Sequence, residues 1–206
     1  MVYPNPQIYQ QLRTIFVHVP KTAGTAIERA LLQGSKGTVG GHTTALGYRS
    51  TYPEVFEHYF KFSVIRHPVD RFVSAFYYLR QQKIHPALNN QVIHECDTID
   101  EFVKWVEMNP ALVQKIVHLL PQHMFLCDAE GLILVDQVYD YDKLPEAWAD
   151  ISERIGITYI PLVKINVSQR PGNFKPSMHV VNLVRKLYAL DYDIFKFNQL
   201  SPVTSK

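Results

Sequence analysis

The hydrophobic and polar positions along the chain predict short strands that alternate with helices. Residues 14–19 and 59–65 are rich in β-branched and aromatic residues, and a proline follows each run closely, as expected of strands that end in a turn. Residues 132–135 are continuously apolar and predict a third, buried strand.

Helical periodicity fills most of the sequence between and after these runs. Thr25 with Glu28, and Thr98 with Glu101, have the spacing of capping boxes at helix starts. The pattern predicts helices over residues 25–33, from Pro68 to about residue 82, and over residues 98–109, 112–120, 146–155 and 179–190.

Strands and helices in this order predict an α/β fold, in which helices flank a central parallel sheet. No repeat or Gly/Ser-rich linker divides the 206 residues, so we expect one domain, residues 1–206. Ligands of such sheets bind beyond the carboxyl ends of the strands. The turns after residues 19 and 65 are therefore the candidate sites.

Composition narrows the class of partner. A formal net charge of +2 is too small to favour nucleic acid or an anionic membrane, so any anion site must be local. No run approaches about 18 consecutive apolar residues, and the first residues lack the basic start and apolar core of a signal peptide. We therefore expect no integral membrane segment and a cytoplasmic location.

The turn after the first strand has the features of an anion site. It opens a helix, whose first N–H groups have no acceptor within the helix and carry partial positive charge. Ala23 and Gly24 let a ligand approach the backbone, Lys21 adds a full charge, and Thr22 and Thr25 add hydroxyl donors. The order differs from the P-loop G-x-x-x-x-G-K-[ST], because the lysine precedes the small residues. A capped helix with a surface lysine is the alternative interpretation.

The turn after the second strand repeats this arrangement. Arg66 follows the strand, Pro68 suits the first turn of a helix, and Ser74 lies about two turns further on. A guanidinium fork and a hydroxyl can together hold a phosphate. The alternative is that Arg66 pairs with Asp70 at the helix start.

Together the two segments resemble the sulfotransferases that use 3′-phosphoadenosine 5′-phosphosulfate (PAPS). The nearer likeness is to the carbohydrate branch that includes the heparan sulfate 2-O- and chondroitin sulfotransferases. Pro20-Lys-Thr-Ala-Gly-Thr25 resembles the family's 5′-phosphosulfate loop, and Ile65-Arg-His-Pro-Val-Asp-Arg-Phe-Val-Ser74 resembles its 3′-phosphate segment. Weaker likenesses follow in the family's order at residues 121–126, 138–144, 165–168 and 188–195, so the resemblance spans most of the chain.

The resemblance implies PAPS as donor, no metal, and a P-loop-like nucleotide-binding fold. Lys21 would contact the bridging oxygen and the sulfuryl group, while Arg66 and Ser74 would hold the 3′-phosphate. Asn166, Ser168 and Arg170 fall where the family has a loop near the nucleotide. The residues implied for the 5′-phosphate are Thr22, Ala23, Gly24, Thr25 and Ala26.

The base that removes the acceptor proton is expected to be His42. An imidazole titrates near neutral pH, and the sulfotransferases resembled here carry a catalytic histidine in a comparable loop. A loop histidine without a role is the alternative. His18 fits a core histidine and His67 a helix cap, whereas Glu54 and Glu57 are alternative bases. His118, His123 and Cys127 have poor spacing for a metal site.

The resemblance implies a hydroxylated acceptor and favours a saccharide. Tyr77, Tyr78 and Arg80 either face such an acceptor or belong to an amphipathic helix with aromatic core contacts. Two other functions stay open: a nucleotide phosphotransferase of related fold and a non-catalytic nucleotide-binding module. The missing Lys-[ST] ending of a P-loop and the lack of a clear magnesium-binding aspartate disfavour the first of these.

Overall fold

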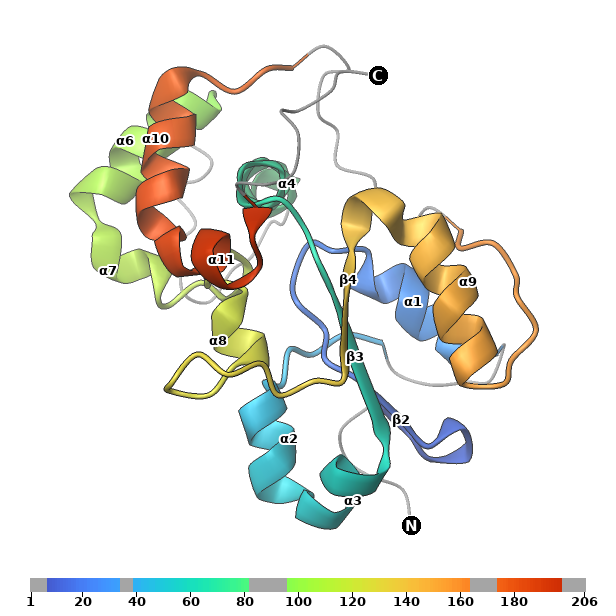
Figure 1. The fold of residues 1–206 in the computed structure, drawn as a ribbon. Coiled ribbons are helices and arrows are strands. Elements are labelled where there is room, and N and C mark those ends of the chain that lie inside the picture. The colour runs from blue at the N-terminus through green and yellow to red at the C-terminus, as the bar shows by residue number, and fades with distance from the viewer. Residues whose placement is uncertain (1–6, 34–38, 82–95, 164–173, 198–206) are drawn as a thin grey trace. The chain divides into compact units, whose positions relative to one another are not determined.

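The sheet has four strands in the order β1-β2-β3-β4 (Figure 1). They are β1 (Ile8–Tyr9), β2 (Thr14–Phe16), β3 (Phe60–Ile65) and β4 (Gln137–Asp140) in a computed structural model that describes residues 7–33, 39–81, 96–163 and 174–197. β2 pairs in parallel with β3, and β3 with β4, which confirms the parallel sheet predicted for the first two strands. β1 adds a short antiparallel edge that the sequence analysis did not predict.

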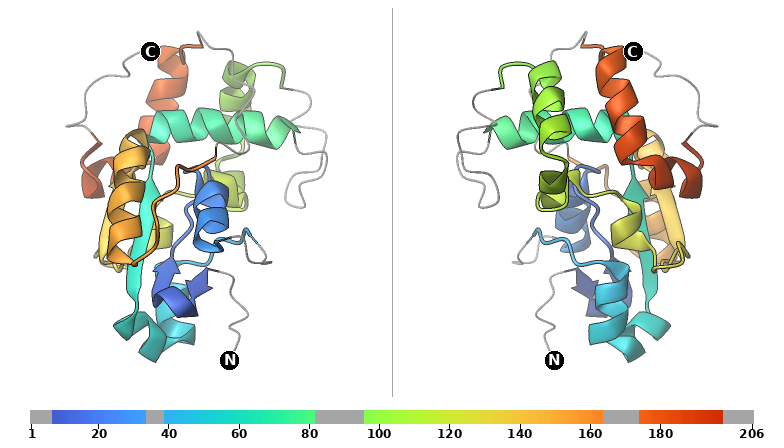
Figure 2. Two further views of the ribbon diagram at one scale, coloured as in Figure 1. Left: turned by 90° about the vertical axis from the view of Figure 1, so that its right-hand side faces the viewer. Right: turned by 90° about the vertical axis from the view of Figure 1, so that its left-hand side faces the viewer.

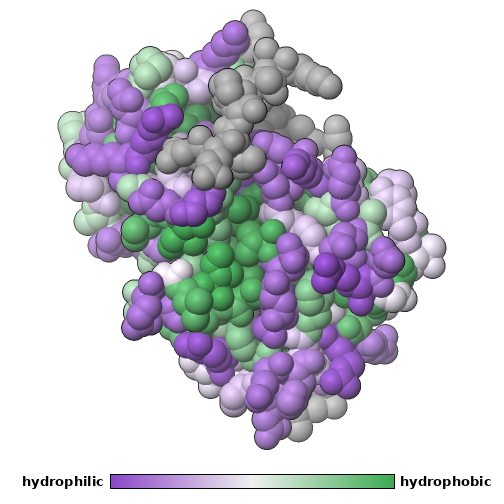
Figure 3. Space-filling model, viewed as in Figure 1, coloured by the Kyte–Doolittle hydropathy of each residue, from purple (hydrophilic) through white to green (hydrophobic). Residues whose placement is uncertain are grey.

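Residues 132–135 do not form the predicted buried strand. Leu132 is 65% exposed, and only Ile133 makes an isolated bridge, to Cys127. Figure 3 shows that hydrophobic surface remains exposed on the face of the molecule seen in Figure 1. The third parallel strand is instead β4, whose half-buried sequence Gln-Val-Tyr-Asp lacks the continuous apolar run of a central strand because it pairs on one side only.

The described residues form two compact units. The first, here called the sheet unit, contains all four strands with α1 (Gly24–Leu31), α2 (Ala45–Thr51), α3 (Pro53–His58), α8 (His123–Leu126) and α9 (Leu144–Arg154). The second, the helical unit, contains α4 (Pro68–Gln81), α6 (Ile99–Met108), α7 (Pro110–Val113), α10 (Met178–Leu187) and α11 (Ala189–Ile194).

Two helices cover one face of the sheet and bury its largest apolar side chains. Ile27 and Leu31 of α1, with Trp148 and Ile151 of α9, pack against β1, β2 and β3. Figures 1 and 2 show α1 and α9 on this face, and α2 and α8 on the opposite face. The sheet unit is therefore covered on both sides, as expected of parallel strands.

The start of α1 differs from the predicted capping box. Its N-cap is Ala23, in the left-handed conformation and without a side-chain cap, and Thr25 lies inside the first turn. Glu28 is instead turned toward His18, Gly40 and Gln7. The local spacing was misleading because tertiary partners outcompete a helix cap for a buried carboxylate.

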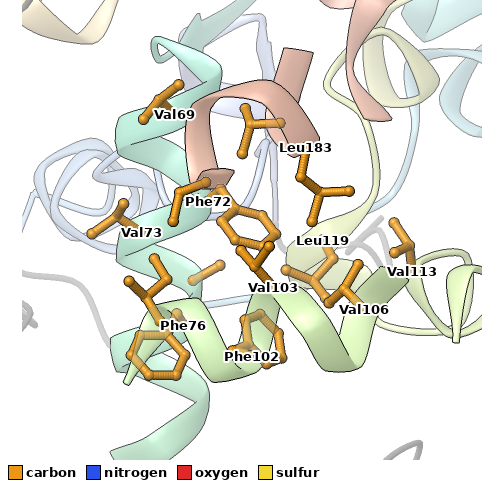
Figure 4. Close-up of a cluster of buried hydrophobic side chains, with 14 of the residues drawn as sticks. Val69, Phe72, Val73, Phe76, Phe102, Val103, Val106, Val113, Leu119 and Leu183 are labelled. Carbon is orange, nitrogen blue, oxygen red and sulfur yellow. The ribbon is translucent and has the colours of Figure 1, made fainter. Parts of the chain in front are cut away.

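The helical unit has its own hydrophobic core. Figure 4 shows apolar side chains of α4, α6 and α10 interlocked around Phe72, Phe102 and Leu183. α6 carries the predicted capping box, with both reciprocal hydrogen bonds between Thr98 and Glu101. The helix predicted over residues 112–120 is only the short α7 and the 3₁₀ turn η2 (Val117–Leu119).

Among the described residues, no helix is long and apolar enough to span a bilayer.

Candidate active site

The carboxyl ends of the parallel strands place three side chains next to one another. β2 leads into the loop that carries Lys21, β3 into Arg66, and β4 into Tyr141. Arg66 Nη1 lies 3.5 Å from the Lys21 carbonyl oxygen, and the guanidinium carbon lies 4.3 Å from the centroid of the Tyr141 ring. The two predicted anion-binding turns therefore meet at one edge of the sheet.

The loop after β2 has an unusual backbone. Lys21 and Ala23 have φ angles of 71° and 66°, in a region that non-glycine residues rarely occupy. Such conformations cost about 1–3 kcal/mol and cluster at functional sites. A left-handed residue followed by a helical one also turns successive N–H groups toward one point, which makes an anion-binding concavity. Ala23 followed by Gly24 has this order.

The Thr22 hydroxyl makes a hydrogen bond within the loop and does not point to a ligand. Its side chain is fully buried, and Oγ1 donates to the Val19 carbonyl oxygen over 2.8 Å. Only the Thr22 N–H is left to contribute to an anion site, so the expected hydroxyl donor is not available there. Thr25 is half-buried in the first turn of α1 and Ala26 is buried.

Gly24 is required because a ring occupies the space of its missing side chain. A Cβ built on Gly24 would overlap the imidazole of His18. His18 is buried, stacks on Phe16 with ring centroids 5.5 Å apart, and bonds Glu28 through Nδ1 at 2.8 Å. The interpretation of His18 as a core histidine is confirmed, and its ring sets how closely α1 approaches the strand.

The electrostatics of this edge favour a bound anion. Burial, helped by the charge of Arg66, lowers the pKa of Lys21 to about 8. The Nε of Arg66 is buried and has no hydrogen-bond partner within the part of the chain that the structure describes. A buried donor without an acceptor is costly, and an anion oxygen would satisfy it.

Gln122 fixes the backbone of Arg66. The fully buried Gln122 side chain accepts from the Arg66 N–H over 2.9 Å and donates to the Arg66 carbonyl oxygen over 2.8 Å. Together with the Tyr141 ring, this pair of bonds limits where the guanidinium can lie. Arg66 is thus held at its backbone and at its head group.

His42 lies in a loop that packs against His18, the residue that comes shortly before the Lys21 loop. Its Nδ1 is 3.0 Å from the His18 carbonyl oxygen, and the two rings meet edge to face with centroids 4.5 Å apart. A carbonyl oxygen can only accept, so in the neutral ring Nδ1 carries the proton and Nε2 the lone pair. This tautomer suits a base that acts through Nε2.

The remaining candidates are placed as follows. Ser74 is buried on α4 in the helical unit. Asn166, Ser168 and Arg170 lie outside the described residues. Glu54 and Glu57 are exposed on α3, which immediately precedes β3 and so lies at its amino end, away from the edge that carries Arg66.

The aromatic stretch of α4 belongs to the fold. Tyr77 and Tyr78 pack against the core of the helical unit, and Arg80 donates to the Asp97 carbonyl oxygen over 2.8 Å. These contacts agree with an amphipathic helix that has aromatic core contacts. Within the described ranges, no group of three or more His, Cys, Asp or Glu side chains is arranged to hold a metal ion.

Comparison with known proteins identifies the family. The model of the sulfotransferase family matches residues 8–198, which is nearly the whole chain. The chain belongs to the sulfotransferase family. The family assigns this sulfotransferase to the enzymes that transfer sulfuryl groups to hydroxylated acceptors. No curated protein and no solved structure matches the chain.

Sequence reasoning missed three residues of this sulfotransferase that the structure places at or behind the site. Gln122, Tyr141 and Gln7 act through contacts with residues far away in the sequence, at Arg66 and Gly40. No local spacing marks such partners. The only signal was that Gln122 and Tyr141 fall within stretches that resemble family landmarks.

Proposed function

We propose that this sulfotransferase moves the sulfuryl group of PAPS to a hydroxyl of an acceptor, and that the acceptor is a saccharide. The observation that carries the proposal is the meeting of Lys21 and Arg66 at neighbouring strand ends, with a buried Arg66 Nε that has no acceptor among the described residues. A nucleotide with phosphates at both its 5′ and 3′ positions matches two adjacent anion-binding turns. The carbohydrate acceptor rests on the family branch that the motifs resemble.

The loop of Lys21 is suited to the 5′-phosphosulfate. The N–H groups of the first turn of α1 and the left-handed Ala23 present donors to a compact anion. Lys21 brings a positive charge, and the pKa of its ammonium group, about 8 here, would rise again beside a bound anion. The family resemblance assigns Arg66 and Ser74 to the 3′-phosphate. It also assigns Ser168 and Arg170 to a loop beside the nucleotide.

The transfer step is an in-line displacement. The acceptor oxygen forms a bond to sulfur while the bond from sulfur to the bridging phosphate oxygen breaks. His42 Nε2 takes the hydroxyl proton, and Lys21 stabilises the charge that remains on the 5′-phosphate of the product 3′,5′-ADP. As in phosphoryl transfer, positioning and electrostatic stabilisation supply most of the rate enhancement.

Ligand binding tests the donor. We expect 3′,5′-ADP to raise the melting temperature more than ATP with magnesium does, because only the former carries a 3′-phosphate for Arg66. Equal or reversed stabilisation would favour the nucleotide phosphotransferase. Binding of 3′,5′-ADP without transfer from labelled PAPS to any of a panel of hydroxylated acceptors, saccharides included, would favour a non-catalytic module.

Two substitutions test the residue roles, each with a matched control. We expect Lys21→Ala and His42→Ala to abolish turnover, with His42→Ala still binding 3′,5′-ADP. Lys104→Ala on α6 and His58→Ala on α3 remove exposed side chains of the same types and should leave turnover unchanged. Full activity in the His42 variant would remove it as the base.

A further inference from the structure

A buried carboxylate in α1 gathers hydrogen bonds from three separate segments. Glu28 is 1% exposed. Its Oε1 accepts from Gln7 Nε2 at 3.1 Å and lies 2.8 Å from His18 Nδ1, and its Oε2 accepts from the Gly40 N–H at 2.5 Å. Burial alone would raise the pKa of Glu28, but the bonds from His18, Gly40 and Gln7 and the charge of His18 lower it. Both oxygens of this buried carboxylate therefore take part in hydrogen bonds.

Gln7 binds the same loop from the other side. It is also buried, and its Nε2 contacts the carbonyl oxygens of Gly40 at 2.5 Å and Gly41 at 3.1 Å. Its Oε1 accepts from the Tyr48 hydroxyl over 2.8 Å, which ties it to α2. Both carbonyls and one N–H of the two glycines are thus held by side chains.

The two glycines have a backbone that only glycine adopts easily. Gly40 and Gly41 have φ angles of 102° and 96°. A Cβ on Gly41 would also lie 3.2 Å from Gln7 Nε2, which is closer than ordinary packing allows. Two consecutive glycines leave the backbone flexible. The position of the residue that follows them therefore depends on the hydrogen bonds from Gln7 and Glu28.

That following residue is His42. His42 Nδ1 lies 3.0 Å from the His18 carbonyl oxygen, and this contact forms only when the loop places His42 beside His18. The ring of His18 is itself held by Glu28, so one carboxylate controls both the loop and the ring against which His42 packs. A connected network of buried hydrogen bonds restricts the arrangement of the segments that it joins.

We propose that Glu28 and Gln7 are positioning residues for His42. They fix Gly40 and Gly41 so that His42 keeps its proton on Nδ1 and its lone pair on Nε2. The inference rests on the proposed function for the role of His42 as base. It gives a reason for a buried charged carboxylate on α1, since a buried charge is weak evidence for stability alone.

Two variants test the proposal. Glu28→Gln keeps the shape but removes the charge, and Gln7→Leu leaves the carboxylate in place, so failure of the first variant to fold leaves the test intact. We expect each to lower kcat by about 10- to 100-fold, because small misplacement of a catalytic group is costly. The KM for PAPS and the Kd for 3′,5′-ADP should change by less than about twofold, since neither substitution removes an anion contact.

The deciding measurement is the tautomer of His42, which ¹⁵N NMR of the imidazole reports. The His42 signals are assigned by their absence from the spectrum of His42→Ala. In the wild type we expect the proton on Nδ1, and in both variants a mixture with the Nε2-protonated form. Asp150→Asn is the matched control, because it also converts a carboxylate to an amide but bonds only Tyr139 and Arg154 among the described side chains. It should change neither kcat nor the tautomer.

Two outcomes separate the proposals. An unchanged tautomer, with 3′,5′-ADP affinity falling as much as kcat, would overturn the positioning role and make the network a support of the nucleotide loop. A shifted tautomer in the variants, with no PAPS turnover in the wild type, would uphold the positioning of His42 and fail the proposed function.

Discussion

At the scale of single residues, Lys21 joins an unfavourable backbone to a perturbed charge. Its φ of 71° places it in the left-handed region, and burial beside Arg66 lowers its pKa to about 8. Both features cost free energy in the protein without ligand. Both are reasonable if the loop is built around an anion, because the anion stabilises the charged form of the lysine and satisfies the N–H groups that the strained backbone directs toward it.

The lowered pKa of Lys21 predicts pH-dependent binding of 3′,5′-ADP. The anion binds the ammonium form, which is the main form below about pH 8 and is lost as the pH rises through that value. We expect the Kd, measured by calorimetry from pH 7 to 9.5, to be constant at the low end. At the high end the Kd should rise by up to about tenfold per pH unit, because the binding weakens.

Lys21→Arg is the control for this titration, because arginine keeps its charge over the whole range. Its binding of 3′,5′-ADP should show little pH dependence between pH 7 and 9.5. Identical profiles for the wild type and Lys21→Arg would show that another group titrates.

At the scale of elements, the sequence predicted the parts of the site whose signal is local. The turns after β2 and β3 were found from β-rich runs that end at proline, and they meet as expected of adjacent parallel strands. β1 and β4 escaped prediction because short edge strands carry little pattern of their own. The spacing of Thr25 and Glu28 predicted a cap, but Glu28 serves a network whose members lie 10 to 21 residues away.

The packing of α1 on the chain after β2 predicts different effects of substitution at two neighbouring positions. Gly24→Ala places a methyl group on the imidazole of His18, so α1 or the ring must move. We expect a loss of about 1–3 kcal/mol in the free energy of unfolding, typical of overpacking, and weaker binding of 3′,5′-ADP.

Ala23→Gly relieves a left-handed φ of 66° and should leave stability within about 1 kcal/mol of the wild type. Urea denaturation of both variants measures the difference. Equal stability of Gly24→Ala and the wild type would mean that the contact between α1 and His18 does not constrain the loop.

At the scale of the whole molecule, the two units are interleaved along the chain. β1 to β3 are followed by α4 to α7 of the helical unit, and α8, β4 and α9 then return to the sheet unit before α10 and α11. β4 reaches its place beside β3 only after this excursion. Neither unit is a continuous segment, so we infer that the two fold as the one domain expected from the sequence, although each has its own core.

Truncation of one core tests this inference. Phe102 is fully buried in the helical unit, and Phe102→Ala should lower the free energy of unfolding by about 3–5 kcal/mol. If the chain unfolds as one domain, native-state hydrogen exchange of the slowest amides in β3 should accelerate by the same factor as that of the slowest amides in α6, because both open only by global unfolding. Met108→Ala removes a side chain on the same helix that is 74% exposed and should change neither rate. Acceleration confined to α6 and its neighbours α4 and α10 would show that the helical unit opens by itself, and the expectation of a single cooperative domain would then be wrong.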